Sequence, residues 1–127
     1  MKTSEKVLIV TDGVDSTCKM AEEIRAVLEG KNVVVRTAAD FSGTDILSAG
    51  ICFFGCEAPR PRSFAYLERL LKHINLAGRS CGVFSPGSQE AAAYLSDMVH
   101  DSELALCPEP LFARPDIAGW VKKVIGS

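Results

Sequence analysis

The sequence predicts an α/β domain in three layers, with a parallel sheet of five strands between helices on both faces. Strand-like and helix-like segments alternate along the whole chain, in five units of about 20–30 residues each. The strand-like segments are short and largely apolar throughout, which is typical of strands covered on both faces. Four of the five are followed by apolar residues at helical spacing, which is typical of a crossover between parallel strands. We expect residues 1–127 to form one such domain, because this length suffices for a single core.

The first unit begins with the apolar run "KVLIVT", residues 6–11, which predicts a strand. Gly30 is expected to end the helix that follows, because glycine adopts the left-handed conformation at a helix C-terminus easily. The apolar residues of that helix recur at helical spacing and are Met20, Ala21, Ile24, Val27 and Leu28.

The next two strands are predicted at 32–37, "NVVVRT", and at 50–55, "GICFFG", with an irregular or short helical piece between them. Ser63 is predicted to be the N-cap of the following helix, which Gly78 ends. One apolar face of that helix consists of Phe64, Leu67, Leu70, Leu71 and Ile74.

The last two units place strands at 79–85, "RSCGVFS", and at 103–107, "ELALC". Ser88 is predicted to cap the helix between them, which carries Ala92, Leu95 and Val99 on one side. The final helix has an apolar face of Ile117, Trp120, Val121, Val124 and Ile125, which assigns the single tryptophan to the core.

Composition excludes several classes of function. A net charge of -2 and a pI near 5.7 argue against nucleic acid and anionic membranes as main partners, since both favour a basic face. The apolar run before Asp12 is too short for a signal-peptide core or a membrane span. The five cysteines form no CxxC and only two histidines are present, which argues against a zinc site. We therefore expect a cytoplasmic protein in which Cys52 and Cys81 are buried as small apolar side chains.

In parallel sheets of this kind, ligands bind beyond the carboxyl ends of the strands. The rule points to three loops of this chain, 11–17, 55–63 and 85–88. Ser16 and Thr17 stand at the start of the first helix. Their hydroxyls either cap the helix or, together with its free N–H groups and its dipole, hold a phosphate.

The chain resembles the flavodoxins over nearly its whole length. The resemblance is carried by the order of the five units and by "KVLIV…STCKMAEEI", "GICFFGC", "RSCGVFSPGS" and "PEPLFARPD". It implies a sheet with strand order 2-1-3-4-5 and an FMN cofactor. It also implies that the protein carries single electrons between redox partner proteins in the cytoplasm.

The resemblance further implies where FMN would lie. Thr17 matches the last residue of the family's phosphate loop, Ser16 the small polar residue before it, and Gly13 supplies a turn. The backbones of the next two loops would flank the flavin ring, and no side chain would be a catalyst. The implied cofactor-binding residues are Thr11, Asp12, Gly13, Val14, Asp15, Ser16, Thr17, Cys56, Glu57, Ala58, Pro59, Ser85, Pro86, Gly87 and Ser88.

Other features of these loops favour an alternative. Val14 replaces a hydroxyl donor of the family, and Asp15 replaces a glycine with a carboxylate that repels phosphate. Neither ring loop carries Trp or Tyr next to its strand. The alternative is therefore a protein of the flavodoxin fold that has lost FMN and serves as a binding or interaction module.

A third interpretation rests on the spacing of Cys56, Arg62 and Ser63, C-x5-R-S between a strand and a helix. This spacing resembles the signature of cysteine-dependent phosphatases, in which a thiolate attacks phosphorus and an arginine binds the phosphate oxygens. Pro59 and Pro61 count against it, because neither has an N–H to donate to a phosphate. In a weaker version, Arg60 and Arg62 bind an anionic group of a ligand or partner. The plainer alternative is that both arginines are solvated on a loop that the prolines stiffen.

Overall fold

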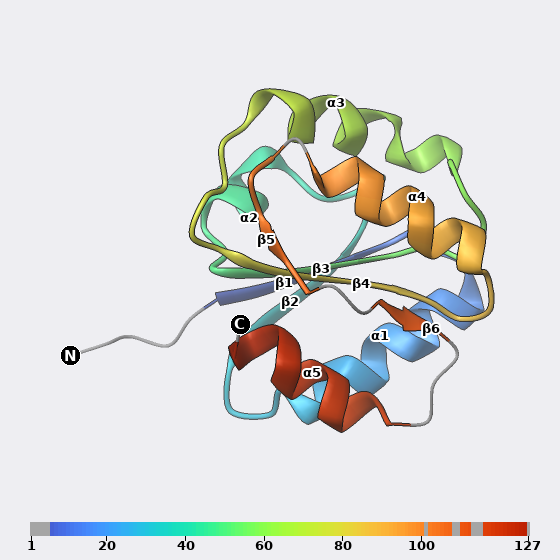
Figure 1. Cartoon of the computed structure of the whole chain (residues 1–127), viewed down its shortest axis with the longest axis vertical. Helices are drawn as coiled ribbons and strands as arrows, with labels where there is room; N and C mark the ends of the chain where they lie inside the picture. The colour runs from blue at the N-terminus through green and yellow to red at the C-terminus, as the bar shows by residue number, and fades with distance from the viewer. Residues whose placement is uncertain (1–5, 101, 108–109, 113–115, 127) are drawn as a thin grey trace.

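The structure, a computed structural model, describes residues 6–100, 102–107, 110–112 and 116–126. It has three layers, with a twisted sheet between two layers of helices (Figure 1). The strands are ordered β2-β1-β3-β4-β5 and every pairing is parallel, which confirms the predicted fold class and strand order. The strands are β1 (Lys6–Thr11), β2 (Asn32–Thr37), β3 (Ile51–Gly55), β4 (Ser80–Ser85), β5 (Ala105–Leu106) and β6 (Leu111–Phe112).

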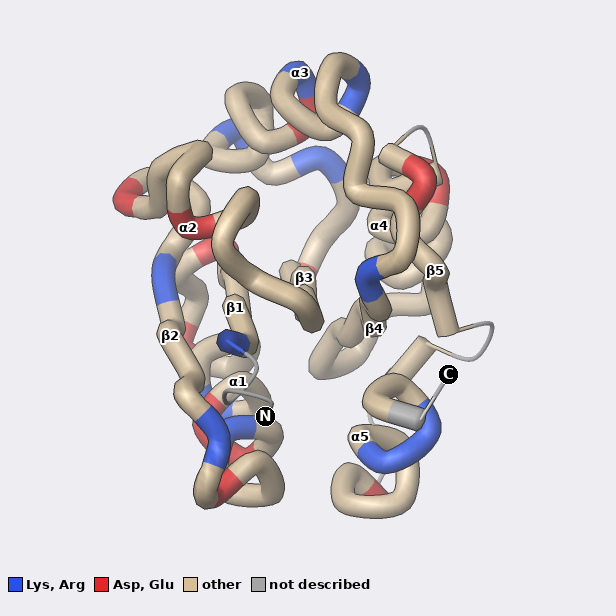
Figure 2. Tube along the Cα trace, turned by 90° about the vertical axis from the view of Figure 1, so that its left-hand side faces the viewer, with Lys and Arg blue, Asp and Glu red and all other residues tan. Residues whose placement is uncertain are grey.

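The helices divide between the two faces of this sheet. One face is covered by α1 and α5, and the other by α3 and α4, with the short α2 beside the edge of the sheet (Figure 1). Residues of both charge signs occur along α1 and along α3 (Figure 2). The helices are α1 (Asp15–Val27), α2 (Gly43–Leu47), α3 (Ala65–His73), α4 (Gln89–His100) and α5 (Ile117–Gly126), and a 3₁₀ turn, η1 (Arg62–Phe64), precedes α3.

Burial of both sheet faces explains why the central strands are apolar throughout. Along β1, Leu8 and Val10 belong to the core beneath α3 and α4, whereas Val7 and Ile9 belong to the core beneath α1 and α5. The same alternation holds for β3. Trp120 lies in the second core with its ring centroid 5.6 Å from that of Phe53, which confirms its predicted core role.

The fifth strand differs from its prediction. Instead of one strand over 103–107, two short strands share the edge of β4: β5 pairs with Ser80 and Cys81, and β6 pairs with Phe84 and Ser85. Pro110, directly before β6, has no N–H to donate to a strand ladder, which fits a break in the strand before β6.

The predicted cap at Ser63 is wrong, whereas the cap at Ser88 is confirmed. Ser63 lies inside η1, where the Phe64 N–H donates to the Pro61 carbonyl at 3.0 Å, and α3 begins only at Ala65. Pro61 fixes its own φ near the value that a 3₁₀ turn requires, so the turn starts before the serine. Ser88 accepts a hydrogen bond from the Ala91 N–H at 3.0 Å, as an N-cap does.

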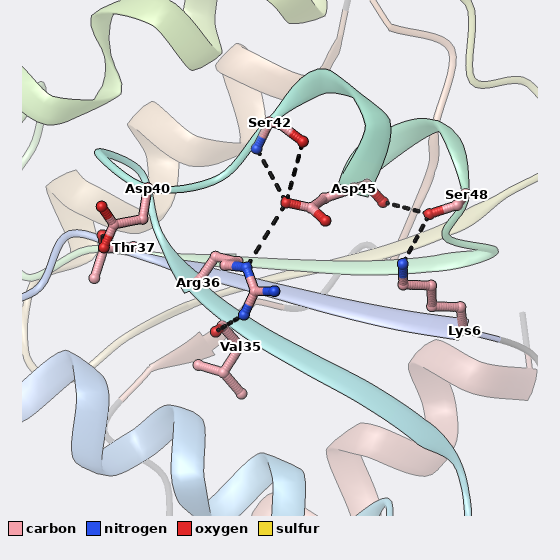
Figure 3. Close-up of polar contacts among 8 residues, drawn as sticks. All are labelled: Lys6, Val35, Arg36, Thr37, Asp40, Ser42, Asp45 and Ser48. Carbon is pink, nitrogen blue, oxygen red and sulfur yellow. Dashed lines mark hydrogen bonds and ion pairs between the residues drawn. The ribbon is translucent and has the colours of Figure 1, made fainter.

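The segment between β2 and β3 is held to the sheet edge by polar contacts (Figure 3). Asp45 accepts a hydrogen bond from the Ser42 N–H at 3.0 Å and approaches the Arg36 guanidinium at 3.8 Å. The Lys6 ammonium donates to Ser48 Oγ at 3.0 Å. These contacts join the α2 segment to both strands: Lys6 is the first residue of β1, whereas Arg36 lies one residue before the carboxyl end of β2.

Candidate functional site

The first two loops at the carboxyl edge of the sheet are in direct contact. The Glu57 N–H donates to Asp12 Oδ2 at 2.8 Å, and the Ser16 hydroxyl donates to Glu57 Oε2 at 3.0 Å. The third loop, 85–88, follows β4, whose Phe84 pairs with Gly55 of β3. The three segments predicted from sequence therefore meet at one edge of the sheet.

The first loop closes on itself through short-range hydrogen bonds. Gly13 has φ +82°, a conformation that glycine adopts without a steric penalty. Its N–H donates to Thr11 Oγ1 at 3.2 Å, and the Val14 N–H donates to Asp12 Oδ1 at 3.0 Å. The Asp12 carboxylate thus accepts backbone hydrogen bonds from both the first and the second loop, and it links the two loops.

The start of α1 differs from a capped helix. Its N-cap is Val14, and no side chain in the part of the chain that the structure describes caps its backbone, so the interpretation of Ser16 and Thr17 as N-caps is wrong. Ser16 is instead bonded to Glu57. The N–H groups of a first helical turn have no partner within the helix and carry the positive end of its dipole.

Thr17 has an unusual environment at this helix start. Its side chain is fully buried, and within the described residues its Oγ1 has no hydrogen-bond partner. A buried hydroxyl without a partner costs about 1–3 kcal/mol, so such groups are rare. A phosphate oxygen at the helix start would supply the missing partner, and the donor set of this turn therefore fits a phosphate.

Carboxylates also lie close to this turn. Asp15 is the first residue of α1 and is exposed, and Glu57 is exposed as well. Neither takes part in an ion pair within 4.0 Å among the described residues. Any phosphate at this turn would therefore experience the negative charge of these carboxylates, which no ion pair within 4.0 Å among the described residues neutralises.

Cys56, which the resemblance placed among the cofactor-binding residues, lies inside the protein. It is 0% exposed and belongs to the core beneath α3 and α4. Burial, and then the carboxylate of Asp12, raise the pKa of its thiol to about 12. Since a nucleophilic cysteine needs a lowered pKa and access to its substrate, the structure argues against the phosphatase interpretation.

The third loop uses its hydroxyls for its own conformation. The Ser88 N–H donates to the buried Ser85 Oγ at 3.3 Å, while Ser88 Oγ caps α4. Pro86 is half-buried and Gly87 is exposed. The backbone of this loop, more than its side chains, is thus available to a ligand.

Sequence reasoning missed a second feature, a cavity of about 460 Å³ between α3 and α4. Arg60, at φ +55°, holds its guanidinium 5.9 Å from the ring centroid of Tyr94. The Tyr94 hydroxyl donates to Glu68, and burial followed by this bond raises the pKa of Tyr94. A signal in the sequence was Tyr94, a polar aromatic residue at helical spacing from Glu90, Asp97 and Met98, which also line the cavity. The cavity is lined by Arg60, Glu68, Lys72, Glu90, Tyr94 and Met98, among others.

Comparison with solved structures identifies the architecture. Flavodoxin 2 from Bacillus cereus superposes with a TM-score of 0.83 at 18% identity, over 95% of this chain and 98% of that one. This chain has the flavodoxin fold. A flavodoxin from Streptococcus pneumoniae gives a TM-score of 0.80 at 16% identity, over 95% and 97% of the two chains.

A flavodoxin from Fusobacterium nucleatum bound to flavin mononucleotide shares the fold too, with a TM-score of 0.73 at 14% identity over 96% and 98% of the chains. No family model matches the sequence, and no curated protein matches it. At these identities the likeness establishes the flavodoxin fold and leaves the ligand to the residues of the site.

A helix that crosses a membrane must be long and apolar. Within the described ranges, no helix combines the length and the apolar character that crossing a membrane would take.

Proposed function

We propose that this protein binds FMN at the carboxyl edge of its sheet and carries single electrons. The observation that supports this most directly is the buried Thr17 hydroxyl, which has no partner among the described residues and lies at a helix start that none of their side chains caps. Both features are explained if a phosphate group belongs there. The flavodoxin fold, shared with a protein bound to flavin mononucleotide, supports the same choice of ligand.

The residues divide into two groups in this proposal. Thr17, Ser16 and Gly13, with the N–H groups of the first turn of α1, hold the phosphate. The backbones of 56–59 and 85–88 flank the flavin ring. FMN, when bound, supplies the one-electron chemistry, and the chain supplies binding and an electrostatic environment. No side chain acts as nucleophile or proton donor, in keeping with the buried, protonated thiol of Cys56.

The partners in this proposal are redox proteins of the cytoplasm. The charge of this chain, -2, is small for electrostatic steering toward a basic partner. We therefore expect association with such partners to depend only weakly on ionic strength, by less than tenfold between low and physiological salt.

A second candidate function, a binding module without flavin, is favoured by a different observation. Asp15 and Glu57 are exposed beside the helix start, and neither has an ion-pair partner among the described residues. In addition, loops 11–17, 56–59 and 85–88 contain no aromatic residue to stack on a flavin ring. Both features weaken flavin binding relative to a site that has aromatic side chains and no carboxylates.

The two functions are separated by a flavin titration. The purified protein is expected to be yellow or to quench the fluorescence of added FMN. Thr17→Val, which keeps the shape and removes the hydroxyl, should weaken FMN binding by roughly 10- to 100-fold, the value of one hydrogen bond to a charged group. Thr17→Ser is the matched control and should stay within about fivefold of wild type, because it keeps the hydroxyl.

The stability of the same variants provides an independent readout. Without ligand, Thr17→Val should unfold at the same urea concentration as wild type or at a higher one, since it removes an unsatisfied buried hydroxyl. A colourless protein that leaves FMN fluorescence unchanged would exclude the electron-carrier function and leave the binding module.

A further inference from the structure

Glu57 is bound to the first loop through both its backbone and its side chain. Its N–H donates to Asp12 Oδ2 at 2.8 Å, and its Oε2 accepts the Ser16 hydroxyl at 3.0 Å. Ser16 is the second residue of α1. A carboxylate oxygen of the chain therefore occupies a place beside the helix start that an oxygen of an external anion would otherwise take.

We infer that Glu57 determines ligand specificity at this site, by competing with the phosphate of a ligand for Ser16 and by repelling it. The inference rests on the proposed function, because it concerns the same site. Its consequence is a reduced preference for a phosphorylated flavin over riboflavin, which has a neutral hydroxyl in place of the phosphate.

The hydrogen bond from the Glu57 N–H to Asp12 keeps the Glu57 carboxylate in competition with a phosphate. For a phosphate to accept the Ser16 hydroxyl, the Glu57 side chain must first release it. The hydrogen bond from the Glu57 N–H to Asp12 remains when the side chain turns away, so the carboxylate stays near the helix start. A neutral hydroxyl group of riboflavin meets no such repulsion.

The surrounding charges do not compensate for Glu57. In the part of the chain that the structure describes, the ion pairs join Arg25 to Glu22 and Arg36 to Asp45, and none includes Glu57. Arg60, three residues further along the same loop, has its guanidinium over the Tyr94 ring. The negative charge of Glu57 therefore acts on the first turn of α1 without a neutralising partner in contact.

The test compares FMN and riboflavin on wild type and Glu57→Gln, a variant that keeps an oxygen for Ser16 but removes the charge. Glu57→Gln should bind FMN about tenfold more tightly at low ionic strength, with riboflavin affinity unchanged within about twofold. The gain should shrink in high salt. Glu29→Gln is the charge-matched control, because Glu29 is exposed beyond the opposite end of α1, and it should alter neither affinity.

A second arm needs no flavin. Inorganic phosphate is titrated into both proteins while the amide signals of Asp15, Ser16 and Thr17 are followed by NMR. Glu57→Gln should bind phosphate about tenfold more tightly than wild type, and Glu57→Ala at least as tightly as Glu57→Gln.

The outcomes keep the two proposals apart. If wild type and variant bind neither flavin but the phosphate result holds, the proposed function fails and the role of Glu57 stands. Equal phosphate affinity in wild type and Glu57→Gln, or no shift of these amides in either protein, overturns the role of Glu57. An equal gain for FMN and riboflavin overturns it as well, because the effect would then not depend on phosphate.

Discussion

Thr17 and Cys56 are both fully buried at the same edge of the sheet, and burial has opposite consequences for them. The thiol of Cys56 is a weak hydrogen-bonding group, so burial among apolar side chains costs little and suppresses its ionisation. The hydroxyl of Thr17 is a strong hydrogen-bonding group, so burial without a partner costs stability. At the residue scale, therefore, the buried hydroxyl of Thr17 is evidence for a ligand, and the buried thiol of Cys56 is not.

The raised pKa of Cys56 predicts a dependence of stability on pH. The folded thiol ionises at about 12 and an unfolded thiol near its ordinary value of 9.0. Below pH 9 the Cys56 thiol is neutral in both the folded and the unfolded protein, and its contribution to the free energy of unfolding is complete. Above pH 9 the unfolded state loses its proton first, so the contribution is lost progressively toward pH 12.

The measurement is urea unfolding of wild type and Cys56→Ala between pH 7 and 10.5. The difference in the free energy of unfolding between wild type and Cys56→Ala should become smaller above pH 9, because only wild type loses the contribution of the thiol. Curves that run parallel over the whole range would show that the thiol of Cys56 ionises equally in both states.

At the element scale, α3 and α4 start by different means although both follow a strand of the same sheet. Ser88 caps α4 with its hydroxyl. The start of α3 has no side-chain cap and is reached through the 3₁₀ turn that Pro61 precedes. The difference lies in how the chain enters each helix, because a serine caps only where its own backbone is extended immediately before the helix.

Ser88→Ala should therefore cost about 1 kcal/mol of stability, because it leaves the Ala91 N–H without its acceptor. Ser63→Ala is the matched control and should stay within about 0.5 kcal/mol of wild type, since Ser63 makes no cap. Urea unfolding of the two single variants measures both. Equal losses would contradict the assignment of the α4 cap to Ser88.

At the scale of the whole molecule, the flavodoxin fold depends on close contact between the sheet and its helix layers. Gly82 of β4 shows how close α5 lies. A Cβ atom at this position would come within 2.8 Å of Val124 Cγ2 and 2.9 Å of the Trp120 ring. Distances below about 3 Å between carbon atoms are repulsive, and neighbours in a packed interior have little room to move.

Gly82→Ala should accordingly destabilise the protein by roughly 1–3 kcal/mol through overpacking. Because Trp120 is the only tryptophan, its fluorescence should change as well, so the site of the disturbance can be observed directly. Gly43→Ala is the comparison, since a Cβ there meets only the Tyr66 hydroxyl at an ordinary 3.8 Å. An unchanged melting temperature for Gly82→Ala would show that α5 packs less closely than the structure indicates.

The sequence alone determined the alternation of elements, the apolar strands and the cap at Ser88. These features follow from local rules: the periodicity of burial within one segment and the hydrogen bonds of one side chain to its own turn. The strand order came from a resemblance and not from periodicity, because nothing within a single segment specifies its neighbour in the sheet. The sequence also placed the three loops at one edge, since parallel strands share the direction of their ends.

Only the tertiary structure decided which side chains of the site are buried, which are bonded to one another and which are free to bind a ligand. The contacts of Glu57 with Ser16 and Asp12 join residues 41 and 45 positions apart, and no local pattern encodes them. The buried hydroxyl of Thr17 and the buried thiol of Cys56 depend on how neighbouring elements exclude water. Solvation and long-range contacts are properties of the folded chain, and they determine which of the predicted residues remain available to a ligand.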